Sequence, residues 1–291
     1  MLGTKFKGFS AAQLKVIALI AMTMDHLAAY GFPIPLFGEN EALLRAIGRI
    51  AAPVFLFVLT ESIRYTRSKG KFLLRLYLGA VGVGLFTTIT NALFLDTIGK
   101  FRQSNILFDY FYVTLYIILL EELIEAIKKR NWKKGILMVA GIAATYIPHY
   151  LSELVYTLPL AEHGIGFRQA WIFYDVVESF VQSPIHGEYP VAFVIAGVLM
   201  YFVKSKYPKA IILVLYSIVY FVNSYIGILQ GLSLSNFLGS MEFYTIFAVP
   251  IVLLYNGEKG KGGKYFFYLY YPLHRYVISI IVYLYGIWSG M

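Results

Sequence analysis

Ionisable side chains stand inside two otherwise apolar stretches near the start of the chain. Asp25 and His26 end one apolar run, and Arg45 and Arg49 stand four residues apart, on one face of a helix. Adjacent helix residues point about 100° apart, so Asp25 is expected to hold an arginine rather than orient His26. His26 then stays available as a general base, because an imidazole with an ordinary pKa of about 6.5 accepts a proton near neutral pH. The plainer interpretation is that the charges only staple two helices.

Three further polar residues are expected at membrane depth. Asn105 and Asp109 share a helix face and would complete the first cluster. Alternatively, Asn105 caps this helix and Asp109 favours its amino-terminal dipole. His274 stands in the last apolar run, shortly after Pro272, which frees the carbonyl of Tyr268. His274 is therefore either a site residue or a side chain hydrogen-bonded within a kink.

Nine apolar runs are long enough to position these groups in a bilayer, since a helix needs about 20 residues to cross it. They cover residues 11–30, 43–63, 72–95, 105–127, 135–157, 189–204, 209–230, 237–256 and 265–289. The sequence predicts an all-α bundle of about nine transmembrane helices, with a range of about eight to ten, in a single membrane domain over 1–291. Residues 158–188 are predicted to form an outer amphipathic or re-entrant segment, because Arg168, Asp175 and Glu178 interrupt their apolar positions.

The composition requires lipid around this bundle. The chain is 59% hydrophobic and 14% charged, whereas soluble domains are about 25% charged. Its net charge of +9 follows the predicted topology and does not indicate a nucleic-acid partner, because basic residues gather in every second connection, at 64–75, 128–134, 204–209 and 259–264. The positive-inside rule places these connections in the cytoplasm. We therefore expect a multi-pass protein of the bacterial cytoplasmic (inner) membrane, with its amino terminus inside and its carboxyl terminus outside.

The sequence lacks the residues that several common kinds of functional site require. Cysteine is absent, which excludes disulfides, thiolate zinc sites and a cysteine nucleophile. The histidines and acids lack a zinc-ligand spacing, so no metal is predicted. A Walker loop, a dinucleotide glycine fingerprint and a nucleophile elbow are also missing. There is no internal repeat of the kind on which many transporters are built.

Five sequence blocks resemble the TraX family of integral membrane proteins. They lie at 14–19, 22–26, 45–55, 255–257 and 266–274. The resemblance covers both ends of the chain and is weak in the middle. The family commonly has a threonine after the Asn-x-x-Phe that this chain carries at 105–108, where Asp109 stands instead.

The resemblance implies an activity. The family's named member is implicated in amino-terminal acetylation of conjugative pilin, and the family is similar to a wider group of transmembrane acyltransferases. It therefore implies an acetyltransferase that takes acetyl from cytoplasmic acetyl-CoA. The acceptor would be an amine or hydroxyl at the outer side, on a pilin, a peptide, a glycan or a cell-wall polymer.

This interpretation assigns roles to several polar residues of the bundle. His26 would be the general base, and Arg45 and Arg49 would stabilise the oxyanion or orient the thioester. Asp25 would hold the arginines, and Asn105 would add a hydrogen-bond donor to the developing charge.

The acyl donor would be positioned by His274, and its phosphates would meet a basic run. That run consists of Arg64, Arg67, Lys69, Lys71 and Arg75. The same residues are also explained by topology alone.

Two other functions stay open. In a proton-coupled or anion transporter, Asp25, His26, Arg45 and Asp109 would form the path of the ion. In a non-catalytic membrane assembly factor, Asp25, Arg45 and Arg49 would matter only for folding.

Overall fold

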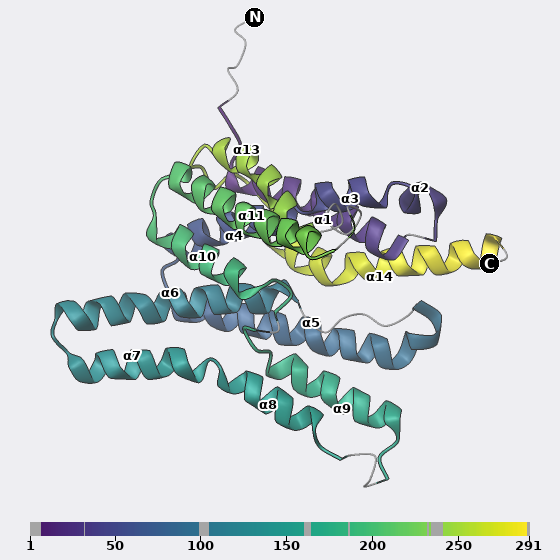
Figure 1. Ribbon diagram of the computed structural model, residues 1–291, viewed down its shortest axis with the longest axis horizontal. Helices are drawn as coiled ribbons and strands as arrows, with labels where there is room; N and C mark the ends of the chain where they lie inside the picture. The colour runs from purple at the N-terminus through teal and green to yellow at the C-terminus, as the bar shows by residue number, and fades with distance from the viewer. Residues whose placement is uncertain are drawn as a thin grey trace, which may run out of the picture. The chain divides into compact units, whose positions relative to one another are not determined.

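The computed structural model of the chain describes residues 7–31, 33–98, 105–159, 164–185, 187–231, 233 and 241–289. Across these residues the secondary structure is helical, and the one β-type contact is an isolated bridge between Phe9 and Tyr255. The all-α fold class predicted from the sequence is thus confirmed for the described residues. The chain divides into two compact units, Met1–Glu61 with Phe202–Met291, and Ser62–Tyr201 (Figure 1).

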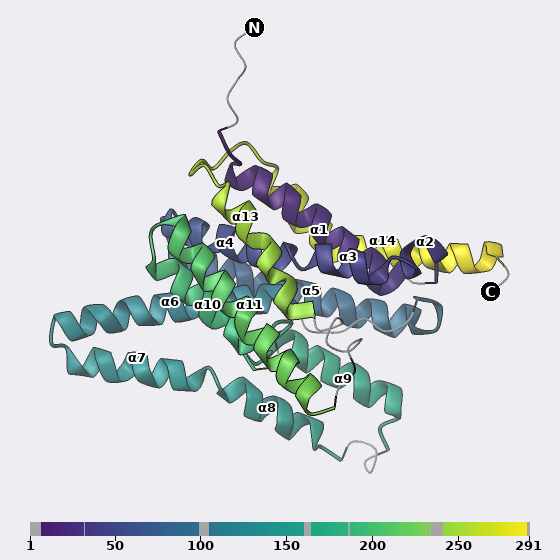
Figure 2. The ribbon, with the colours of Figure 1, turned by 45° about the horizontal axis from the view of Figure 1, so that its top comes forward.

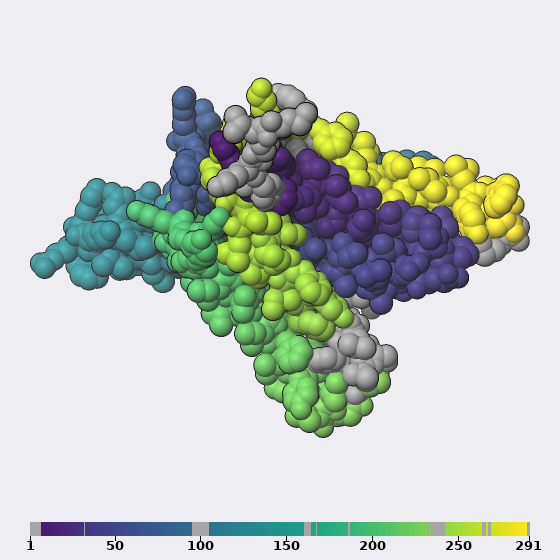
Figure 3. Space-filling view, turned by 90° about the horizontal axis from the view of Figure 1, so that it is seen from above, coloured from purple at the N-terminus to yellow at the C-terminus, as the bar shows by residue number. Residues whose placement is uncertain are grey.

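In the first unit, α1 (Ala11–Gly31) packs against α3 (Glu41–Gly48) and against α14 (Lys264–Ser289). Figure 2 shows these helices side by side, and Figure 3 shows the α1–α3 segment next to α14 at the surface. α11 (Lys206–Leu229) packs against two further elements. These are the 3-10 helix η1 (Met241–Phe247) and α13 (Ala248–Leu253). α2 (Pro35–Gly38) and the start of α4 (Ala51–Arg64) complete the unit. The contact between α1 and α14 joins the two ends of the sequence.

A short segment from the end of α13 holds the start of α1. The first backbone N–H groups of a helix have no carbonyl partner within it. Here Ala11 donates to the carbonyl of Glu258 at 2.8 Å, and Ala12 donates to that of Lys259 at 3.1 Å. Phe9 adds a backbone hydrogen bond of 2.7 Å to the carbonyl of Leu254. The start of α1 is therefore fixed beside the segment that leads into α14.

The second predicted helix, 43–63, is interrupted close to its arginines. α3 ends at Gly48, a turn covers Arg49 and Ile50, and α4 begins at Ala51. The interruption fits Pro53, which has no N–H to donate to the carbonyl of Arg49. The interruption is short, because the Arg49 N–H still donates to the carbonyl of Arg45 at 3.1 Å.

The second unit is built on α5 (Lys69–Ile98), which packs against two helices of this unit. These are α6 (Ile106–Lys128) and α9 (Phe167–Phe180). α6 packs against α7 (Trp132–Ala144), and α8 (Ile147–Tyr156) packs against α9. In the sequence, α10 (Val191–Phe202) is followed by the part of the chain that returns to the first unit. The predicted helix 135–157 is therefore divided at Thr145 and Tyr146, just before Pro148.

The predicted outer segment 158–188 contains α9, while residues 160–163 and 186 lie outside the described part of the chain. α9 is amphipathic, with its polar side turned inward. Asp175 and Ser179 are buried, and the Ser179 hydroxyl lies 3.3 Å from that of Thr88 on α5. Phe173 and Phe180 are exposed. An apolar outer face over a polar inner face is the arrangement that a lipid environment favours.

The exposed surfaces of both units are apolar, as in a membrane protein. Five helical segments of the described residues are long and apolar enough to cross a bilayer. They are Ala11–Gly31, Glu41–Arg64, Lys69–Phe94, Trp132–Tyr156 and Lys206–Leu229. The shorter segments Val191–Phe202 and Glu242–Leu253 are also apolar. The count of about nine spans, the sides on which the termini lie, and the single membrane domain stay predictions.

Candidate functional site

Two histidines that are 248 positions apart in the sequence meet between α1 and α14. The Nδ1 atom of His26 is hydrogen-bonded to Nε2 of His274. Their rings are stacked, with centroids 4.6 Å apart and planes 16° from parallel. The His274 ring also stacks on the ring of Tyr270, with centroids 5.2 Å apart and planes 4° from parallel. The sequence offers both histidines as site residues, and the structure brings them into direct contact.

The hydrogen bonds fix which nitrogen of each neutral ring carries hydrogen. His274 Nδ1 lies 3.0 Å from the backbone carbonyl oxygen of Tyr270. A carbonyl only accepts hydrogen bonds, so Nδ1 of His274 carries its hydrogen and Nε2 is the acceptor. His26 must then donate from Nδ1, which leaves the lone pair of its Nε2 as the basic position of the pair. His274 is buried, whereas His26 is partly exposed.

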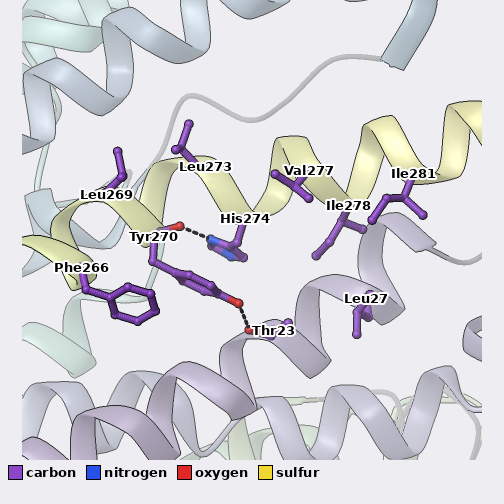
Figure 4. Close-up of a pocket in the computed structure, with 10 residues that line it drawn as sticks. All are labelled: Thr23, Leu27, Phe266, Leu269, Tyr270, Leu273, His274, Val277, Ile278 and Ile281. Atoms are coloured by element: carbon purple, nitrogen blue, oxygen red, sulfur yellow. Dashed lines mark hydrogen bonds between the residues drawn. The ribbon is translucent and has the colours of Figure 1, made fainter. Parts of the chain in front are cut away.

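A cavity of about 390 Å³ opens beside His274, between α1 and α14 (Figure 4). Leucine, isoleucine, valine and phenylalanine side chains form most of its wall. Its polar groups are His274 and a pair of hydroxyls, Thr23 and Tyr270, which are 2.7 Å apart. The Thr23 hydroxyl donates to the carbonyl of Leu19 at 2.8 Å, so Tyr270 is the donor to Thr23. The cavity is thus a mainly apolar space whose wall includes one member of the histidine pair, His274.

The arginines of the second predicted helix are held by carboxylates. Arg45 donates to Asp25 at 2.8 Å, so the ion pair expected between these helices is present. Arg49 donates to Glu242 of η1 at 3.3 Å. Glu242 was not among the site residues expected from the sequence. Glu242 is the single acidic residue of the apolar run 237–256. An acidic side chain inside a membrane usually has a partner, so this position alone indicates that Glu242 pairs with another polar group.

Arg275, next to His274, is a second residue that sequence reasoning missed. Its side chain is buried, and its guanidinium lies 5.1 Å from the ring centre of Tyr276 and donates to the Tyr276 hydroxyl at 3.2 Å. Together with Arg45 and Arg49, it is one of the cations that act electrostatically on His26. Such a group of guanidinium donors suits the stabilisation of an anion that forms beside the imidazole.

The other predicted site residues belong to the second unit. Asn105 stands at the start of α6, but its side chain makes no capping hydrogen bond and donates instead to the carbonyl of Ala80 at 3.3 Å. In the basic run, Arg64 donates to the carbonyl of Tyr201 at 2.5 Å, and Lys69 contacts Glu121 at 2.6 Å. The remaining members are exposed: Arg67, Lys71 and Arg75. The described residues contain no group of three or more histidines and acids that could hold a metal ion.

Close packing of α1 on α3 gives a direct test of this geometry. A Cβ atom at Gly48 would lie 2.8 Å from Cα of Asp25, so Gly48→Ala must separate the two helices. We expect a loss of about 1–3 kcal/mol in stability, measured by thermal unfolding in detergent. Gly82→Ala on α5 is the control, since no atom lies within 4 Å of its Cβ position and alanine favours a helix. Equal stability of the two variants would contradict the packing.

Comparison of the sequence with known proteins places the chain in a family. The profile described as TraX protein matches residues 10–175. The probable fimbrial assembly protein FimC, serogroup H1, of Dichelobacter nodosus is 28% identical over 277 residues, which cover 91% of this chain and 93% of that protein. No solved structure matches the chain. The profile match contains Asp25, His26, Arg45 and Arg49, and it ends before His274.

Proposed function

The chain belongs to the TraX family, and we propose that it is a membrane-bound acetyltransferase that acts in fimbrial or pilus assembly. We place it in the bacterial inner membrane, with its amino terminus in the cytoplasm, and its relationship to transmembrane acyltransferases is part of the proposal. The name of the Dichelobacter relative supports the link to fimbriae. The observation that carries the catalytic part is the chain of contacts from His26 through His274 to the carbonyl of Tyr270.

In this proposal, acetyl-CoA is the donor and an amine or hydroxyl is the acceptor. The acceptor nitrogen or oxygen attacks the thioester carbonyl carbon, while Nε2 of His26 takes the acceptor proton. The new bond to carbon forms, the carbon–sulfur bond breaks, and the thiol of CoA leaves with that proton. The oxyanion that develops is stabilised by guanidinium donors, for which Arg45, Arg49 and Arg275 are the candidates.

His274 is a positioning residue in this scheme. Its Nδ1–H is held by a backbone carbonyl, so its Nε2 is always presented to His26 when both rings are neutral. This holds the His26 ring in one orientation and one tautomer, the role that a hydrogen-bonded partner plays for many catalytic histidines.

The donor phosphates would be bound by the exposed members of the basic run, Arg67, Lys71 and Arg75. Arg64 and Lys69 are already engaged by Tyr201 and Glu121, so a phosphate would have to compete with these partners. The acceptor class stays open among pilin, peptide, glycan and cell-wall polymer, and pilin is the one that the relative's name favours.

A non-catalytic assembly factor is the second candidate, and the ion pairs favour it. Arg45 and Arg49 each meet a carboxylate, as expected of charges that only tie helices together. This function requires no turnover of acetyl-CoA.

The experiment that separates the two uses the purified full chain in detergent with radiolabelled acetyl-CoA. CoA release, or transfer of label to pilin, supports the acetyltransferase. Arg49→Lys adds a second criterion, since lysine keeps the charge but lacks the planar fork of donors. We expect Arg49→Lys to keep its stability and lose most of its turnover. If the native chain neither binds nor turns over acetyl-CoA, the assembly factor is favoured.

A further inference from the structure

The cavity between α1 and α14 follows α14 for about four turns. Its wall on α14 extends from Phe266 to Ile281, and α1 contributes Thr23 and Leu27 (Figure 4). At a rise of 1.5 Å per residue, this stretch of α14 is about 22 Å long. One leaflet of a bilayer contains about 15 Å of hydrocarbon, half of the usual core. The cavity is therefore a groove long enough for the acyl chain of a lipid.

The groove is open along its apolar wall. Phe266, Leu269, Val277 and Ile281 are each more than half exposed. In a membrane protein, an exposed apolar surface of this kind marks a contact with lipid or with another apolar partner. An acyl chain can therefore enter the groove from the side.

The polar groups of the groove are hydrogen-bonded within the protein. The hydroxyls of Thr23 and Tyr270 lie 2.7 Å apart. His274 uses one ring nitrogen for His26 and the other for the carbonyl of Tyr270. A ligand of this groove is therefore recognised mainly by its hydrocarbon, and its charged part must bind elsewhere.

Both helices begin at the same end of the groove. Thr23 contacts Tyr270 and His26 contacts His274, at sequence separations of 247 and 248. Nearly equal separations mean that α1 and α14 run parallel. The backbone hydrogen bond from Ala12 to Lys259 has the same spacing and places the segment before α14 at the start of α1, as Figure 2 shows.

Positive charge gathers at this end. Residues 256–264 contain three lysines and one acid, and the side chains of Lys259 and Lys261 are exposed. Lys259 also acts electrostatically on Lys15 of α1, which has the same sign, so an anion between them is favourable. Clusters of lysines at a membrane surface attract the phosphates of anionic lipids. Phe266 follows Lys259 by seven residues, about 10 Å along a helix, so one lipid can reach both.

We propose that the groove between α1 and α14 binds one anionic phospholipid of the surrounding bilayer. Its phosphate contacts Lys259 and Lys261, and one of its acyl chains lies along α14 from Phe266 toward Ile281. The chain covers the hydrogen bond between Thr23 and Tyr270 and excludes water from it. The site does not depend on the proposed acetyl transfer.

Thermal unfolding of the full chain in nonionic detergent tests the contact with the head group. Dioleoyl phosphatidylglycerol, which is anionic, is compared with dioleoyl phosphatidylcholine, which is not. We expect phosphatidylglycerol to raise the melting temperature by about 5 °C and phosphatidylcholine to raise it by less than about 1 °C. The difference should vanish in Lys259→Gln with Lys261→Gln. Lys128→Gln with Lys133→Gln is the matched control, because it removes two exposed lysines of another basic connection and should keep the difference.

Native mass spectrometry with added phosphatidylglycerol tests the contact with the acyl chain. The native chain should retain one lipid, and Val277→Trp should lose it because the larger side chain fills the groove. Val219→Trp makes the same change at an exposed valine of α11 and should keep the lipid. Equal effects of the two lipids on the melting temperature of the native chain, or a lipid retained by Val277→Trp, would overturn the proposal.

Discussion

A His26→Ala protein that keeps its fold is expected to lose acetyl transfer by about 10²- to 10⁴-fold, the range for removal of a general base. The hydrogen-bonding pattern leaves Nε2 of His26 as the basic atom of the pair, and alanine supplies no substitute. The measurement is label transfer from acetyl-CoA at matched thermal stability. His149→Ala, on α8 of the other unit, is the control and should keep its activity.

His274 should respond in a graded way, because it acts through His26. Glutamine can accept the hydrogen bond from Nδ1 of His26 through its side-chain oxygen, whereas alanine cannot. We expect His274→Ala to lower kcat by about 10-fold or more with little change in KM, and His274→Gln to recover part of the loss. If His274 only packed between α1 and α14, its replacement would not lower kcat selectively while KM stayed nearly unchanged. Full transfer by His26→Ala would remove both histidines from the mechanism.

The helices of this chain are readable from its sequence because apolar runs and prolines are local signals. The predicted run 11–30 matches α1, and 209–230 matches α11. Pro53 and Pro148 mark the places where two predicted helices are interrupted. The number of membrane spans is harder to predict from the sequence, because a charged or short helix can lie at membrane depth when it is packed among other helices.

The candidate site was predictable only where its partners are close in sequence. Asp25 and Arg45 lie on consecutive predicted helices, so their ion pair follows from depth and spacing. The contact of His26 with His274 depends on which helices are neighbours in the bundle, and no local pattern contains that information. The same holds for Glu242, whose pairing with Arg49 requires η1 to lie against α3.

Lys209 has a structural role in addition to the one that the positive-inside rule explains. By sequence it belongs to a basic connection that positive-inside reasoning places in the cytoplasm. In the structure its side chain is completely buried on α11. Its ammonium is hydrogen-bonded to Glu61 of α4, donates to the Thr60 hydroxyl at 3.3 Å and lies 5.2 Å from the ring centre of Phe57. This ion pair joins two helices that are far apart in the sequence.

Replacement of Lys209 with methionine is therefore expected to destabilise the protein by about 3–5 kcal/mol, because the change strands the carboxylate of Glu61 without its partner. The double variant Lys209→Met with Glu61→Leu removes both charges and should recover most of that loss, since apolar replacements for a buried pair are often neutral. Equilibrium unfolding in mixed micelles provides the measurement.

The exposed pair of Lys129 and Glu125 on α6 is the matched control for this effect. Its side chains are in contact at 2.5 Å, but that of Lys129 is 71% exposed. Solvent screens such a pair, so Lys129→Met should leave the unfolding curve unchanged. The contrast isolates burial as the cause, because both variants lose the same type of ion pair. If Lys209→Met were no more damaging than Lys129→Met, or if the double variant were less stable than Lys209→Met alone, the stranded carboxylate would not explain the loss.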